Sequence, residues 1–157
     1  RLWMLIRTGD GVLWQSHSAD GGFSWNEATP STIPNPGSRF FIRRLASGNL
    51  LLINHYKFTG RSHLTARLST DEGASWNEGL LIDSRSGVSY PDAVQDKDGL
   101  IWMVQDRDRQ GDGEILLSTF REEDVASGTN TSKLVKLSSP VKAPTGPTST
   151  QPSRLWT

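Results

Sequence analysis

A ten-residue segment occurs twice in this chain, and that repeat constrains the fold more than any other feature. SADGGFSWNE at 18–27 matches STDEGASWNE at 69–78 at seven positions without a gap. The same offset of 51 residues aligns 38–53 with 89–104, and in both segments a turn precedes an apolar run. A period of about 50 residues is typical of β-propeller blades, which are four-stranded sheets. The sequence therefore predicts an all-β propeller.

Short apolar segments between glycine-rich turns mark the expected strands of about three blades. These strands lie at 2–7, 12–18, 39–45, 50–55, 63–69, 79–83, 90–95, 100–105 and 114–120. The first copy of the unit lacks the strand that opens the other two copies. We expect one partial propeller over residues 1–126.

The end of the chain differs in composition, because 16 of residues 127–157 are Ser, Thr or Pro. Such a composition buries little apolar surface, so we expect 127–157 to be a tail that is disordered over 138–157. The chain opens in an apolar segment without Met, and three blades are fewer than the roughly four to eight that close a propeller. We therefore expect the C-terminal portion of a longer propeller whose N-terminal half is missing here.

Charge and composition argue against several function classes. Lys and Arg number 17, Asp and Glu also number 17, and there is no cysteine. Zero net charge disfavours nucleic-acid binding, and the missing cysteines exclude disulfides and thiolate zinc sites. No apolar run approaches the ~20 residues of a membrane span. His55 and His63 lack a third ligand at matching spacing, so we expect neither a metal nor a cofactor.

The repeated pattern Ser-x-Asp-x-Gly-x-x-Trp is typical of a structural hairpin turn. An Asp side chain can accept hydrogen bonds from turn amides, Gly supplies the backbone geometry, and Trp covers apolar surface. A sugar or calcium ligand is the alternative role, but an Asp engaged by its own turn is a poor catalyst. The residues concerned are Ser18, Asp20, Gly22 and Trp25 in the first copy, and Ser69, Asp71, Gly73 and Trp76 in the second.

These boxes resemble the Asp-box, or bacterial neuraminidase, repeats of the sialidase superfamily over about residues 1–125. The order Arg7, Asp-box, Arg61, Asp-box, Tyr90 matches the family's order. The resemblance implies a six-bladed propeller with an axial active site and peripheral Asp-boxes. It also implies that Arg7 and Arg61 are the second and third substrate-binding arginines and that Tyr90 is the nucleophile. The first arginine, the acid/base Asp and the Glu that activates the tyrosine would lie upstream of Arg1.

Four further residues are candidates for substrate contact. Arg39 occupies the blade position of Tyr90 in the preceding repeat, and Asp92 follows Tyr90 by two residues on the same strand face. His55 ends a strand near the expected axis, and Asp106 lies in line with it, followed by Arg107 and Arg109. Solvated charges and packed strand aromatics are the alternative interpretations of all these candidates. Pro91 indicates that Tyr90 lies on an edge strand or at a bulge.

The resemblance implies an exo-acting glycoside hydrolase whose partner is an acidic glycan, with secretion or a periplasmic location suggested on the same basis. Arginine forks suit the carboxylate of sialic acid, and a neutral tyrosine avoids the repulsion that a carboxylate nucleophile would meet. Pro91 replaces the small residue that often follows the family's tyrosine. We expect this chain alone to be inactive. The alternatives are a uronate hydrolase or lyase, a non-catalytic glycan-binding propeller, and a fragment without function.

Overall fold

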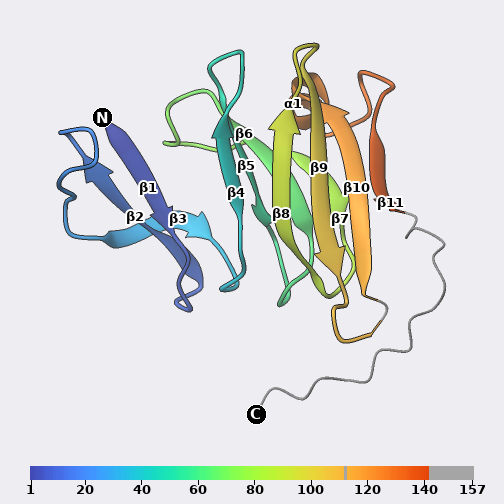
Figure 1. The fold of residues 1–157 in the computed structure, drawn as a ribbon, viewed down its shortest axis with the longest axis horizontal. Coiled ribbons are helices and arrows are strands. Elements are labelled where there is room, and N and C mark those ends of the chain that lie inside the picture. The colour runs from blue at the N-terminus through green and yellow to red at the C-terminus, as the bar shows by residue number, and fades with distance from the viewer. Residues whose placement is uncertain (112, 142–157) are drawn as a thin grey trace.

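The computed structural model describes residues 1–111 and 113–141, which form three antiparallel sheets side by side (Figure 1). In each sheet the strands pair in chain order, as in a propeller blade. The first sheet contains β1 (Leu2–Ile6), β2 (Val12–Ser18) and β3 (Thr29–Pro34). The second contains β4 (Phe41–Arg44), β5 (Leu50–His55), β6 (Leu64–Ser69) and β7 (Leu80–Asp83). The third contains β8 (Val88–Gln95), β9 (Leu100–Arg107), β10 (Glu114–Arg121) and β11 (Lys136–Pro140).

The register shows how the first blade relates to the others. Leu2 of β1 pairs with Ser18, and Leu50 of β5 pairs with Ser69, so both Asp-box serines face the first residue of the neighbouring strand. Strands β1–β3 therefore correspond to β5–β7, and the first sheet has no counterpart of β4. The predicted all-β architecture of blade-like units is confirmed.

The predicted tail needs a correction, because β11 lies within it. Ser138 donates its backbone N–H to Ser118 Oγ at 2.9 Å, and its hydroxyl bonds Asp83 Oδ2 at 2.9 Å. Val135 and Leu137 pack against the core of the second and third blades. A serine-rich segment thus completes the third blade through its few apolar side chains. Residues 142–157 of the predicted tail lie outside the described residues.

Two apolar clusters join the three sheets. The larger cluster lies between the second and third sheets, and Leu13, Ile33 and Leu52 form the centre of the smaller one between the first and second. Every residue of β5 and β6 is buried because the second sheet has a neighbour on each face. Burial on both faces explains why β5 begins with a continuous apolar run, whereas the polar residues that alternate with apolar ones in β6 are buried and hydrogen-bonded.

Both Asp-boxes form the same hydrogen-bonded turn. Asp71 Oδ1 accepts from Ser69 Oγ at 2.7 Å and from the Ser75 N–H at 2.9 Å, and the distances around Asp20 are nearly the same. Hydrogen bonds from Ser75 and Ser69 lower the pKa of Asp71 to about 2, and those from Ser24 and Ser18 lower the pKa of Asp20 further. The carboxylates are therefore acceptors that hold the turns closed.

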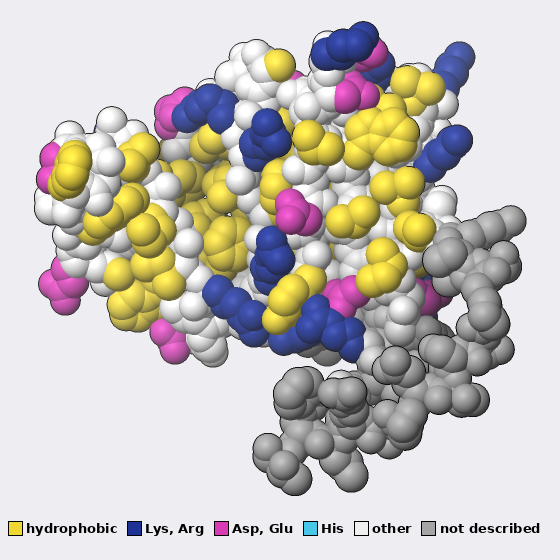
Figure 2. All heavy atoms as spheres, viewed as in Figure 1, with side chains coloured by type: hydrophobic (Ala, Val, Ile, Leu, Met, Phe, Trp, Pro, Cys, Tyr) yellow, Lys and Arg dark blue, Asp and Glu magenta, His cyan; other side chains and the backbone are white. Residues whose placement is uncertain are grey.

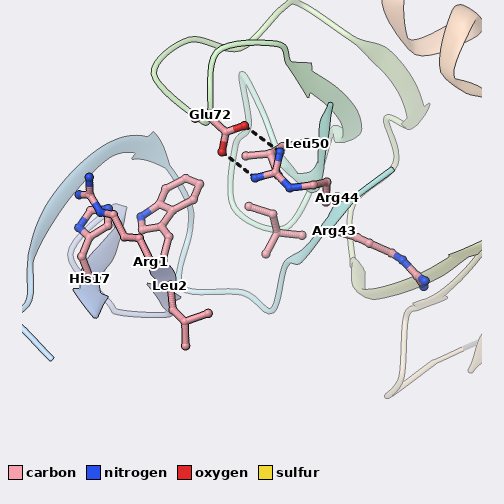
Figure 3. Close-up of a pocket in the computed structure, with 9 residues that line it drawn as sticks. Arg1, Leu2, His17, Arg43, Arg44, Leu50 and Glu72 are labelled. Carbon is pink, nitrogen blue, oxygen red and sulfur yellow. Dashed lines mark hydrogen bonds and ion pairs between the residues drawn. The ribbon is translucent and has the colours of Figure 1, made fainter. Parts of the chain in front are cut away.

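The second Asp-box also contacts the first blade. A Cβ added to Gly73 would lie 2.6 Å from ring carbons of Trp3, so only glycine fits there. Glu72 beside it forms an ion pair with Arg44 at 2.6 Å. Below this contact, an open groove of about 630 Å³ separates the first and second sheets, with Arg1, Leu2, His17, Arg43 and Leu50 around it (Figure 3).

The helix α1 (Glu122–Ser127) follows β10 and joins the third blade to the second. Its buried Asp124 accepts hydrogen bonds from the Arg121 N–H and from both the N–H and hydroxyl of Ser132, each at 2.7 Å. Asn77 Nδ2, next to the second Asp-box, donates to the Val125 carbonyl at 2.8 Å. Among the described residues, no helix is long and apolar enough to span a membrane.

Candidate functional site

Each blade has a loop between the strands that correspond to β5 and β6 of the second blade, and these three loops lie at the same end of the sheets. They follow β1, β5 and β9, at the lower edge in Figure 1, while the Asp-box turns lie at the upper end. Each loop region carries an arginine, namely Arg7, Arg61 and Arg109. Figure 2 shows basic side chains gathered along this lower edge with acidic ones beside them.

Tyr90 lies at the same end, near the start of β8. Strand β8 is the edge strand of its sheet, and its pairing with β9 shifts between Ser89 and Asp92. Tyr90 has φ of +53°, in the left-handed region that non-glycine residues rarely adopt. Pro91 offers no N–H to the ladder, so the irregularity falls where the sequence predicts an edge or bulge. The bulge sets the direction of the Tyr90 side chain.

Guanidinium groups from all three blades surround Tyr90. Arg7 donates from Nη1 to Tyr90 Oη at 3.4 Å and from Nε to the Gly37 carbonyl at 2.6 Å. The guanidinium carbon of Arg109 is 3.8 Å from the centroid of the Tyr90 ring, and that of Arg61 is 6.0 Å away. The hydrogen bond from Arg7, followed by one from Arg109, lowers the pKa of Tyr90 below its usual value. Positive charge around the phenol favours its anionic form.

Asp106 lies behind Arg109 and fixes it. Its Oδ1 accepts from Ser89 Oγ at 3.0 Å, and its Oδ2 pairs with Arg109 Nε. The side chain of Asp106 is only 11% exposed, whereas that of Arg109 is 45% exposed. Asp106 therefore contacts the site through Arg109.

Arg39 and Asp92 form a separate ion pair between the second and third blades. Their closest atoms, Nη2 and Oδ2, are 3.4 Å apart, and their side chains are 51% and 58% exposed. Such an exposed pair contributes little to stability. The bulge interrupts strand alternation, so spacing alone no longer places Asp92 on the same face as Tyr90.

The sequence model of a family described as the BNR repeat-like domain matches residues 1–103. The chain belongs to the BNR repeat-like domain family. The match includes both Asp-boxes, Arg7, Arg61 and Tyr90, and it ends within β9 before Asp106 and Arg109. The Asp-box resemblance is thereby confirmed at the level of the repeat family. No curated protein matches the chain closely enough to count as a relative.

In this BNR repeat-like domain, His55 does not reach the surface, which corrects its expected contact with a sugar. The residue is completely buried, and its Nδ1 bonds the Ser62 carbonyl at 2.8 Å. Burial is the main cause that lowers the pKa of His55, so the ring is neutral near pH 7 and Nδ1 is the donor. His55 thus holds the loop that carries Arg61.

The structure gives Arg109 a larger role than the sequence indicates. In the sequence, Arg109 is only one of several charged residues after the strand at 100–105. In the structure, its guanidinium lies closer to the Tyr90 ring than that of Arg61 does. One signal is available in the sequence, because the loop of Arg109 holds the same blade position as the loop of Arg61. In the part of the chain that the structure describes, no three His, Cys, Asp or Glu side chains lie close enough to hold a metal ion.

Proposed function

We propose that this BNR repeat-like domain belongs to a sialidase-like exo-glycoside hydrolase that acts on terminal sialic acid or a similar acidic sugar. The observation that carries the proposal is the convergence of Arg7, Arg61 and Arg109, from three different blades, on Tyr90. Guanidinium forks bind carboxylates through paired, charge-assisted hydrogen bonds. A sugar carboxylate that binds beside Tyr90 would hold the anomeric carbon near the phenol.

In the proposed reaction, Tyr90 Oη attacks the anomeric carbon while the bond to the leaving-group oxygen breaks. That oxygen takes a proton from a general acid, and a second base removes the phenol proton. Water then cleaves the glycosyl–tyrosine bond and regenerates the phenol. The family resemblance implies that the acid, the base and a further arginine come from other blades.

Two exposed surfaces support the proposal that further blades complete the ring. In the first sheet, β1 is an edge strand, and its Leu2 and Met4 are 45% and 39% exposed. At the other end of the row, yellow side chains cover the outer face of the third sheet in Figure 2. The large apolar residues exposed on β8, β9 and β10 of this sheet are Val94, Trp102, Val104 and Ile115. Apolar sheet faces of this kind usually pack against another layer.

The proposal is tested by calorimetric titration of the chain with N-acetylneuraminate and with its methyl ester. The ester keeps the sugar ring but lacks the charge, so we expect at least about tenfold weaker binding of the ester. Arg7→Gln should weaken binding of the acid to a similar degree. Arg44→Gln, far from Tyr90 and paired with Glu72, serves as the control and should leave binding unchanged.

The outcomes separate the alternatives. Equal binding of acid and ester, or no binding of either, would contradict a carboxylate site. Binding of glucuronate without N-acetylneuraminate would favour an enzyme or binding module for uronates. The chain alone should not hydrolyse a fluorogenic sialoside, because the resemblance places the acid/base groups elsewhere; turnover that Tyr90→Phe abolishes would refute that expectation.

A further inference from the structure

The side chains of Ser89, Asp106 and Arg109 form a continuous chain of contacts that ends on the Tyr90 ring. Ser89 is buried in β8, and its hydroxyl donates to Asp106 Oδ1 at 3.0 Å. Asp106, near the end of β9, pairs through Oδ2 with Arg109. The guanidinium carbon of Arg109 then lies 3.8 Å from the ring centroid of Tyr90. The contacts thus lead from the buried Ser89, through the ion-paired Asp106, to the partly exposed Arg109 at the Tyr90 ring.

We propose that Arg109 is a positioning residue for Tyr90, held by Asp106 and Ser89 so that its guanidinium covers the phenol ring while Arg7 contacts the phenol oxygen. The proposal rests on the proposed function and deepens it, because it assigns Arg109 to the tyrosine rather than to the sugar. Arg7 can contact both the phenol and a bound carboxylate. Arg109, occupied by the ring and by Asp106, has less freedom to do so.

The backbone around Tyr90 supports a positioning role. A left-handed residue at a bulge is conformationally costly, and such residues persist where the surrounding structure holds them. Ser89 and Tyr90 are neighbours in β8, so the contact chain returns to the strand on which it began. The bulge, the ion pair and the ring contact therefore form one closed unit of β8, β9 and the following loop.

The charges around Tyr90 favour the phenolate. Arg7, Arg61 and Arg109 contribute positive charge from three elements, while Asp106 is paired with Arg109 and Asp92 with Arg39. A cation over an aromatic ring is held more strongly when the ring carries negative charge. The pKa of Tyr90 is lowered accordingly, with the hydrogen bond from Arg7 as the largest cause and that from Arg109 next. Arg109 would thus prime the nucleophile.

The test uses the fact that the chain has only two tyrosines, Tyr56 and Tyr90. In a Tyr56→Phe background, the ultraviolet absorbance of phenolate during a pH titration reports Tyr90 alone. We expect Arg109→Gln to raise the titration midpoint by about one pH unit, because one nearby cation is lost. Arg109→Lys should restore part of the shift, and the control Arg44→Gln should leave the midpoint unchanged. A midpoint that Arg109→Gln does not move would overturn the proposal.

Asp106→Asn distinguishes positioning from a simple charge effect by the sign of the shift. Loss of the negative charge of Asp106 would by itself lower the midpoint of the Tyr90 titration. Loss of the ion pair that holds Arg109 over the ring would instead raise this midpoint. We expect Asp106→Asn to raise the titration midpoint, and we expect the double variant with Arg109→Gln to have nearly the same midpoint as Arg109→Gln alone. A fall would overturn the role of Asp106.

The proposed function and this inference fail in different ways. If Arg109→Gln moves the midpoint but N-acetylneuraminate does not bind, the positioning role stands and the proposed function falls. If N-acetylneuraminate binds and Arg7→Gln weakens this binding, but Arg109→Gln leaves the midpoint unchanged, the proposed function stands and the positioning role of Arg109 falls.

Discussion

Single residues set the geometry of both Asp-boxes, and Asp71 shows the effect of pH. Its folded pKa of about 2 lies below the ordinary value of 3.8, because Ser75 and Ser69 donate to the carboxylate. A lowered folded pKa gives stability that is complete above the unfolded pKa and is lost as pH falls through the folded value. The contribution of Asp71 therefore disappears as pH falls from about 4 to about 2.

This linkage predicts that Asp71→Asn lowers the midpoint of thermal unfolding at neutral pH. The difference from the wild type should narrow as pH falls from about 4 to about 2, since wild-type Asp71 then becomes protonated. Thermal unfolding followed by circular dichroism at several pH values measures this difference in midpoint. Asp98→Asn, which removes a carboxylate paired with Lys97 on the surface, should cause little change. A difference that is independent of pH would contradict the account.

A second prediction at this scale concerns the contact between Gly73 and Trp3. Gly73 and Gly22 occupy the same Asp-box position with φ of +89° and +100°, so alanine brings similar backbone strain to both. The new Cβ would lie 2.6 Å from the Trp3 ring at Gly73, but 3.3 Å from one methyl of Leu2 at Gly22. Gly73→Ala should therefore destabilise the chain by about 1–3 kcal/mol more than Gly22→Ala in urea denaturation. Equal effects would show that the interblade contact carries no energy.

At this scale, sequence spacing predicts the residues of both boxes, but it does not predict the surroundings of individual charges. His55 ends a strand as expected, yet its burial depends on the loop that folds over it. Arg109 contacts Tyr90 because of a bulge and a loop conformation. Neither feature leaves a periodic signal in the sequence, so tertiary structure was needed to find them.

Among the secondary-structure elements, α1 contacts the second blade through the Val125 carbonyl and is held to the third blade by the buried carboxylate of Asp124. Asp124 accepts three hydrogen bonds, and its removal would leave the partly buried donors of Ser132 and Arg121 without this acceptor. We expect Asp124→Ala to lower the free energy of unfolding by about 2 kcal/mol or more. Chemical denaturation measures the loss, with the exposed neighbour Glu123→Gln as the control. A loss no larger than that of the control would contradict this role.

The predicted strands illustrate what local pattern can and cannot show. Short segments of continuous or alternating apolar residues between turns locate β5, β6, β9 and β10 to within one or two residues. Strands β3 and β11 were not predicted because prolines, threonines and serines dominate them. Both lie at the outer edge of a sheet, where one strand partner suffices and polar side chains face solvent.

Across the whole molecule, the repeat predicts how the blades follow one another, and the structure adds how they cooperate. Blades one and two share the smaller core, and blades two and three share the larger core. The candidate site needs all three blades, because Arg7, Arg61 and Tyr90 each come from a different one. The chain order of arginines and tyrosine suggests this meeting, but only the packed sheets give the distances between them.

The most direct test of the central claim is a titration of the Tyr56→Phe chain with N-acetylneuraminate, followed by the ring resonances of Tyr90 in an NMR spectrum. Tyr90 is then the single tyrosine, and its phenol oxygen contacts Arg7, which would hold the sugar carboxylate. We predict a saturable shift of these resonances with the acid, little shift with the methyl ester, and loss of the response in Arg7→Gln. Binding of the acid that leaves Tyr90 unperturbed, or an equal response to the ester, would contradict a carboxylate site at Tyr90.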